Sequence, residues 1–173
     1  YTVKYAGTDG TLLWEQRYDG PAGGGDQAQG VAVDGSGNVV VTGWSASGGT
    51  FGWDFSITDF YTAKYAAADG ALLWEKRYNG PADGDDQAMA MALDGSGNVV
   101  MTGFSYNGTN EFHYYTAKYA AADGALLWEK RANGSGEAVA VAVDASGNVV
   151  VTGSSFNSRG NIDYYTAKYA AAE

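Results

Sequence analysis

The chain has 173 residues, and its 20 acidic residues against 10 lysines and arginines give a formal net charge of −10. This acidity argues against nucleic acids and anionic membrane surfaces as partners, because few positive charges can replace the counterions around phosphate groups. The chain has no cysteine, which excludes disulfides, thiolate catalysis and cysteine-ligated metals. With 45% hydrophobic residues, 26 glycines and only 2 prolines, the composition predicts a folded, turn-rich protein.

Three motifs recur in a fixed order, so the chain is a tandem repeat. Y-T-x-K-Y recurs at intervals of 60, 54 and 50 residues, beginning at Tyr1, and its first three copies are followed by L-L-W-E. D-x-S-G-N-V-V then begins at residues 34, 94 and 144. This period is near the ~40–50 residues of one β-propeller blade. Because the chain starts at a tyrosine and shows neither a signal peptide nor an apolar membrane span, we expect an excised piece of a longer protein.

Each repeat predicts four short strands, which we name A to D. In the second complete repeat these are residues 88–93, 99–104, 114–120 and 126–131. Strand A of the last repeat, residues 138–143, alternates alanine with valine, so both of its faces are apolar and we expect both to be buried. The fold class expected is therefore all-β, made of propeller blades with four antiparallel strands.

The same pattern divides the chain into two complete blades and two partial ones. The partial blades are residues 1–18 and 137–170, and the complete blades are residues 26–78 and 86–131. The count is thirteen strands, one more than three blades need, and three blades are fewer than the ~4–8 that close a ring. We therefore expect either further blades of a longer chain or self-association. The simplest self-association is a dimer that closes a six-bladed ring, with residues 12–17 of one chain completing the last blade of another.

The pairing of strands C and D is predicted from the Asp-Gly turns. Asp-Gly is the strongest signal of a two-residue hairpin. Folding about residues 69–70 places Lys64 opposite Glu75 and Tyr65 opposite Trp74, with the tryptophan inside and the lysine outside. The other copies give the same ion pairs and aromatic pairs, each worth ~0.2–1 kcal/mol: Lys4–Glu15, Tyr5–Trp14, Lys118–Glu129 and Tyr119–Trp128. The alternative is a helix over A-K-Y-A-A-A-D-G-A-L-L-W-E-K-R, which is rich in helix formers.

These motifs resemble a known family. Y-T-A-K-Y, D-G-A-L-L-W-E-K-R-Y and V-A-V-D-x-S-G-N-V-V-V-T-G resemble the bacterial β-propeller repeat called the SBBP repeat, over nearly the whole chain. A-x-D-G-x-L-L-W is similar to the tryptophan-docking motif of quinoprotein propellers, and V-A-V-D-x-S-G-N to a hairpin of NHL-type propellers. The resemblance implies four-stranded blades within large secreted or cell-surface bacterial proteins, and it implies no single activity.

The loops that differ between repeats are the candidate binding surface. The B–C and D–A loops share one end of a blade and vary in length, and binding residues usually lie on loops held by a rigid scaffold. Their aromatic and polar residues would suit a glycan or a protein ligand, or would instead pack over the blade edges. The candidates are Trp44, Phe51, Trp53, Phe55, Tyr106, Phe112, His113, Phe156 and Arg159.

Catalytic and metal chemistry find little support in the sequence. His113 is the only histidine, so a triad or a histidine metal site lacks its partners. The acidic turn at residues 83–86 lacks the spacing of a calcium loop. We expect no enzyme, cofactor or metal, and a structural scaffold or binding module outside the cell. The alternatives are a carbohydrate-binding propeller and, from the tryptophan motif, a fragment of a quinoprotein-like oxidoreductase.

Overall fold

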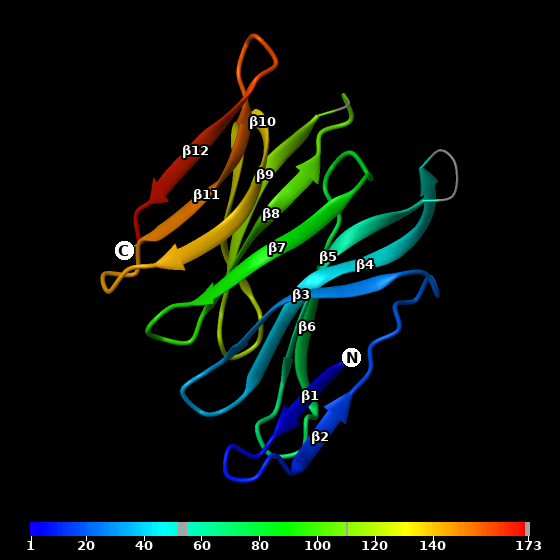
Figure 1. Cartoon of the computed structure of the whole chain (residues 1–173), viewed down its shortest axis with the longest axis vertical. Helices are drawn as coiled ribbons and strands as arrows, with labels where there is room; N and C mark the ends of the chain where they lie inside the picture. The colour runs from blue at the N-terminus through cyan, green and yellow to red at the C-terminus, as the bar shows by residue number, and fades with distance from the viewer. Residues whose placement is uncertain (52–54, 110, 172–173) are drawn as a thin grey trace.

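The structure is a computed structural model that describes residues 1–51, 55–109 and 111–171. These residues form twelve strands and no helix, and every strand pair is antiparallel (Figure 1). The all-β prediction is therefore confirmed, and the helical alternative is wrong. The strands are β1 (Thr2–Tyr5), β2 (Leu12–Gln16), β3 (Asp26–Val33), β4 (Val39–Phe51), β5 (Phe55–Tyr65), β6 (Leu72–Tyr78), β7 (Asp86–Leu93), β8 (Val99–Tyr106), β9 (Phe112–Tyr119), β10 (Leu126–Val143), β11 (Val149–Phe156) and β12 (Ile162–Tyr169).

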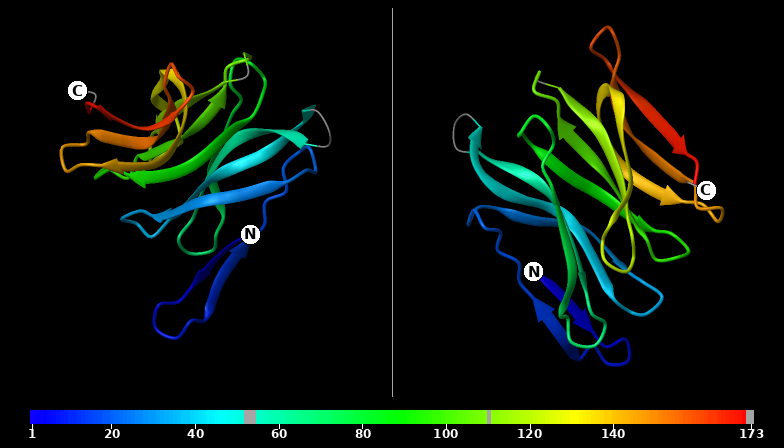
Figure 2. Two further views of the ribbon diagram at one scale, coloured as in Figure 1. Left: turned by 45° about the horizontal axis from the view of Figure 1, so that its top comes forward. Right: turned by 180° about the vertical axis from the view of Figure 1, so that it is seen from behind.

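The strands form three sheets that follow one another in chain order. They are the hairpin β1–β2, the four-stranded sheet β3–β4–β5–β6, and a six-stranded sheet that runs from β7 to β12. Figure 2 shows the hairpin at one end of the molecule and β12 at the other. We call β3–β6 unit 1, β7–β9 with residues 126–131 unit 2, and residues 136–143 with β11 and β12 unit 3.

The strand count differs from the thirteen predicted because β10 belongs to two units. Its first part pairs with β9 and its second part with β11. Units 1 and 2 are separated by residues 79–85, which form a turn and loop. The corresponding connection before unit 3 spans only residues 132–135, which is too short for such a loop, and the backbone continues as strand.

The predicted pairing of the C–D hairpins is wrong by one residue. Ala66 N donates to Ala71 O at 2.8 Å, and Gly70 N donates to Ala66 O at 3.1 Å, so the loop spans residues 67–70. Lys64 therefore lies opposite Trp74, and Ala63 opposite Glu75. A four-residue loop, ending in a glycine with a φ of 71°, replaces the expected two-residue turn. The other hairpins show the same shift, with Lys4 opposite Trp14 and Lys118 opposite Trp128.

The shift sends the repeated lysine into the interior instead of the surface. Lys64 is 4% exposed, and its Nζ lies 2.8 Å from the Asp34 carboxylate and donates to Ala121 O in unit 2. Burial alone would raise the pKa of Asp34, but hydrogen bonds from Lys64 and Asn38 hold it at about 2. The same ion pair joins Lys118 to Asp94 and Lys168 to Asp144. The predicted lysine–glutamate pairs are thus replaced by pairs that join strand C to the A–B turn.

Trp14 and Trp74 lie inside, as predicted, and each bonds to the unit that follows, whereas Trp128 is half-buried. The Trp74 side chain is 7% exposed, and its Nε1 donates to Ala121 O at 3.3 Å. Trp14 Nε1 donates in the same way to Ala67 O at 3.2 Å. Between units 1 and 2, Trp74 is part of a buried apolar cluster with members from both units, Phe60 and Tyr115 among them. Burial between neighbouring units therefore forms the core.

Replacing Lys64 by alanine should destabilise the protein strongly. The change leaves Asp34 without its counter-ion at 8% side-chain exposure, and breaking a buried pair costs about 3–5 kcal/mol. The matched control is Lys168→Ala, because this lysine has 57% side-chain exposure and exposed pairs contribute about 0–1 kcal/mol. Chemical denaturation measures both. Equal losses would contradict the burial of Lys64.

The glycines of the C–D loops provide a second matched pair. Gly124 has a φ of 67°, and a methyl group there would lie 2.9 Å from the Trp74 ring. Gly10 has a φ of 74° with nothing within 4 Å. Gly10→Ala should therefore cost about 1–2 kcal/mol of backbone strain, and Gly124→Ala about 1–3 kcal/mol more because the tryptophan must move. Thermal unfolding of the two variants tests this order, and a Gly124→Ala protein as stable as Gly10→Ala would contradict it.

Candidate functional site

The loops gather at two ends of each unit, as the repeat pattern predicts. At one end, the A–B turn contacts the C–D loop, since Ala67 N donates to Asn38 Oδ1 at 3.0 Å. At the other end, the B–C loop contacts the D–A loop, since Tyr106 N donates to Asp85 O at 3.0 Å. The first end is nearly identical in each unit, and the second carries the sequence differences. The candidate binding residues therefore belong to this second end.

The candidates in unit 2 lie close together. The Phe112 ring lies 4.9 Å from that of Phe104 and 5.8 Å from that of Tyr106. His113 Nε2 is 3.0 Å from Asn107 Nδ2 and 3.5 Å from the Glu111 carboxylate. Phe112 and His113 are each half-buried. These side chains contact their own β8–β9 hairpin, the arrangement expected if they pack over the sheet edge.

The candidates in units 1 and 3 are spread over separate loops. Trp44 is half-buried, and its ring lies over Gly25, where a methyl group would be 3.5 Å away. Phe51 and Phe55 are backbone partners in β4 and β5, and Trp53 lies outside the described residues. Phe156 is 49% exposed, and Arg159 is exposed in the turn that follows it.

The junctions between units contain a polar network that the sequence analysis did not predict. Arg77 Nη2 donates to Ser45 Oγ at 2.6 Å and to the Tyr18 hydroxyl at 3.0 Å. The next junction repeats this network, with Arg131 donating to Ser105 and to the Tyr78 hydroxyl. The arginine and serine belong to unit 1 at the first junction and to unit 2 at the second, whereas the tyrosine comes from the segment before that unit: Tyr18 after the N-terminal hairpin and Tyr78 at the end of unit 1. The R-Y pair after L-L-W-E, together with the serine after T-G, was the signal available in the sequence.

Each of these tyrosines also stacks on a tyrosine of the neighbouring unit. The Tyr18 and Tyr61 ring centroids are 3.8 Å apart at 22°, and those of Tyr78 and Tyr115 are 3.9 Å apart at 13°. Burial, and the hydrogen bond that Tyr115 donates to Glu129, raise the pKa of Tyr115 far above its usual value. The Tyr115 phenol therefore stays neutral at physiological pH.

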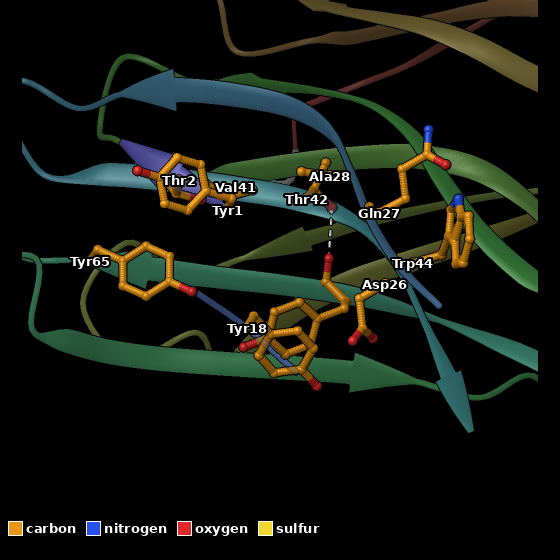
Figure 3. Close-up of a pocket in the computed structure, with 12 residues that line it drawn as sticks. Tyr1, Thr2, Tyr18, Asp26, Gln27, Ala28, Val41, Thr42, Trp44 and Tyr65 are labelled. Atoms are coloured by element: carbon orange, nitrogen blue, oxygen red, sulfur yellow. Dashed lines mark hydrogen bonds between the residues drawn. The ribbon is translucent and has the colours of Figure 1, made fainter. Parts of the chain in front are cut away.

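A small cavity adjoins the first of these junctions (Figure 3). It has a volume of about 50 Å³ and lies between the N-terminal hairpin and unit 1. Figure 3 shows Tyr18 and Asp26 in the middle of its lining, with Tyr65 and Trp44 at opposite ends. This volume has room for a few water molecules and not for an organic ligand.

The buried carboxylate of Asp86 is the most perturbed acid of the loop end. Its Oδ2 accepts a hydrogen bond from Gly80 N at 2.5 Å, while its Oδ1 has no hydrogen-bond partner among the described residues. Burial raises the pKa of Asp86 to about 6, although hydrogen bonds from Ser105 and Gly80 act in the opposite direction. This carboxyl group therefore ionises in mildly acidic solution.

Neither a metal-binding cluster nor a membrane-spanning helix is found in the part of the chain that the structure describes. Within it, no three histidine, aspartate or glutamate side chains are grouped closely enough to hold a metal ion. None of the described segments is a helix with the length and apolar character needed to cross a bilayer. Comparison with protein-family models and with characterised proteins finds no match to this sequence.

Asp86→Asn should change how stability depends on pH. The folded-state pKa of about 6 lies above that of an unfolded aspartate, so the native state binds a proton more tightly and wild-type stability falls as pH rises from 4 to 7. Asparagine removes this dependence. Relative to Asp86→Asn, the wild type should lose about 2–3 kcal/mol over this range. Urea denaturation at pH 4, 5.5 and 7 measures the difference. A constant difference would show that Asp86 does not titrate there.

Proposed function

We propose that this chain is a non-catalytic β-propeller repeat module, secreted or displayed at the cell surface, that serves as a scaffold and interaction module. Unit 1 supports the blade assignment, because its four strands pair in sequence order as an antiparallel sheet. Repeated contacts of tryptophan, lysine, arginine and tyrosine connect the N-terminal hairpin to unit 1 and unit 1 to unit 2. The side chains that recur from repeat to repeat therefore serve mainly to hold neighbouring units together.

One observation carries the proposal of an interaction role. The residue before Y-T-x-K-Y is Phe60 in unit 1, Tyr114 in unit 2 and Tyr164 in unit 3. Phe60 is 0% exposed and Tyr114 is 2% exposed, because the following unit covers them, whereas Tyr164 is 98% exposed. Ile162 and Val139 of unit 3 are also exposed. Unit 3 therefore presents the kind of face that units 1 and 2 bury.

The opposite end of the chain presents the complementary face. Val31 and Val33 of β3 are exposed, whereas Met91 and Leu93, at the same positions of β7, pack against the core between units 1 and 2. Exposed apolar patches of this kind are typical of interaction sites. The exposed apolar face of unit 3 can therefore pack against the face of unit 1 that carries Val31 and Val33 in a second copy.

We propose that two copies associate head to tail through these faces. A twofold arrangement brings both pairs of faces together and closes one ring, the simplest closed solution. Exchange of β2 into the partner's last sheet is not required, because β2 is already hydrogen-bonded to β1. The exposed edge of β12 adds backbone donors and acceptors that favour such an assembly.

The mass of the protein in solution tests this proposal. Tyr164→Asp places a charge on the unit 3 face and should convert the dimer into a monomer. The matched control is Leu73→Asp, because Leu73 is 49% exposed on β6 and its counterparts Leu13 and Leu127 are 50% exposed in the other copies. This position therefore lies outside the contacts between units. Multi-angle light scattering should show a dimer for the wild type and for the control.

Two results would contradict the proposal. A wild-type chain that stays monomeric at ~100 μM would rule out self-association of useful strength. A Tyr164→Asp protein that remains dimeric would place the interface elsewhere.

A further inference from the structure

The junction between units 2 and 3 lacks the tyrosine that fills the two earlier junctions. Tyr18 and Tyr78, which directly follow the arginine after L-L-W-E, stack on Tyr61 and Tyr115. The residue at the same position before unit 3 is Ala132. The stacked ring is therefore missing at this junction.

An open cleft occupies the corresponding place. It has a volume of about 400 Å³, within the range of small-molecule sites. Ala132 lies in its wall together with Tyr114, Ser155, Tyr165 and Tyr169. Tyr165 holds the position of Tyr61 and Tyr115 and is 39% exposed, whereas Tyr115 is 1% exposed beneath its stacked partner.

The aromatic residues of the cleft are arranged like those that surround the Tyr78 ring at the junction between units 1 and 2. There, Phe60 meets Tyr115 edge-on at 5.2 Å and 72°, and Tyr78 stacks on Tyr115. In the cleft, Tyr114 meets Tyr165 in the same manner, at 5.3 Å and 84°. A planar ring beside Ala132 would therefore find a face to stack on and an edge to contact, the two arrangements that aromatic rings prefer.

Polar groups of the cleft suit a phenol hydroxyl. At the filled junction, Arg131 Nη2 donates both to the Tyr78 hydroxyl and to Ser105 Oγ, so these two oxygens lie near each other. Ser155 holds the position of Ser105 and lines the cleft. The Tyr114 hydroxyl is itself buried and has no hydrogen-bond partner among the described residues, so Tyr114 contributes its ring to the cleft wall.

We propose that this cleft binds a neutral phenol ring, carried by a tyrosine side chain of another polypeptide or by a free phenolic compound. The ring stacks on Tyr165 where Tyr18 and Tyr78 stack at the other junctions, and its hydroxyl bonds to Ser155. This proposal uses the junction inside one chain and is independent of self-association.

Titration of the full chain with p-cresol, followed by ¹H–¹⁵N NMR, tests the proposal. Shifts should appear around residues 132, 155 and 165, and toluene, which lacks the hydroxyl, should bind several-fold more weakly. Ala132→Tyr supplies the missing ring from the chain itself. It should weaken p-cresol binding at least about tenfold while keeping the melting temperature at or above that of the wild type.

Two further variants make the test specific. Ser155→Ala should weaken the binding of p-cresol and leave the binding of toluene unchanged. This variant provides the test if Ala132→Tyr does not fold. Tyr78→Ala should create a second p-cresol site between units 1 and 2. Tighter binding of N-acetyl-tyrosinamide than of p-cresol would indicate a polypeptide ligand, and the reverse order a free phenol. No p-cresol binding by the wild type, or equal binding by wild type and Ala132→Tyr, would overturn the proposal.

Discussion

The structure depends on the contact between one unit and the next. The inner strands of each unit are apolar on both faces, so a unit buries its residues only when a neighbouring sheet covers each face. Phe60 and Trp74 of unit 1 reach full or nearly full burial because unit 2 lies against them. Since hydrophobic burial is the main favourable contribution to folding, the stability of each unit is largely that of its interfaces.

The polar contacts make these interfaces specific. A buried face of leucine or valine alone would allow neighbouring sheets to slide, because hydrophobic contacts have little directional preference. Lys64 accepts only one arrangement, since its ammonium group must reach both Asp34 within its unit and Ala121 O of the next. At the other end of the same interface, Arg131 donates to Ser105 and to Tyr78, and Tyr78 stacks on Tyr115. Units 1 and 2 are therefore held against each other at both ends of their interface.

Unit 3 shows how small sequence changes alter such a repeat. A shortened connection turns a loop into the continuous strand β10, and Ala132 takes the place of a stacked tyrosine. The lysine–aspartate pair remains at 2.8 Å, but Lys168 is 57% exposed where Lys64 is buried. The same residues thus form the same local contact in different surroundings, and the interfacial role appears only where a neighbouring unit is present.

Sequence patterns alone predict the all-β class, the tandem repeat, the approximate strands and the inward position of Trp14 and Trp74. These features rest on local signals, namely alternating apolar residues, glycine turns and repeated motifs, which need no knowledge of distant neighbours. The repeat pattern also indicates that the B–C and D–A loops share one end of a unit, and in unit 2 these two loops are hydrogen-bonded to each other.

Only the tertiary structure decided the register of the hairpins, the burial of the lysines and the cleft beside Ala132. An Asp-Gly pair fits a two-residue turn and also the end of a four-residue loop, and a shift of one residue moves side chains to the other face. The acid that pairs with Lys64 is Asp34, which is 30 positions away in the turn between β3 and β4, while Glu75 is nearer in the sequence. The cleft is lined by residues from two units. That Ala132 leaves a space for a ring is evident only in the folded structure, where Tyr165 lines the same cleft.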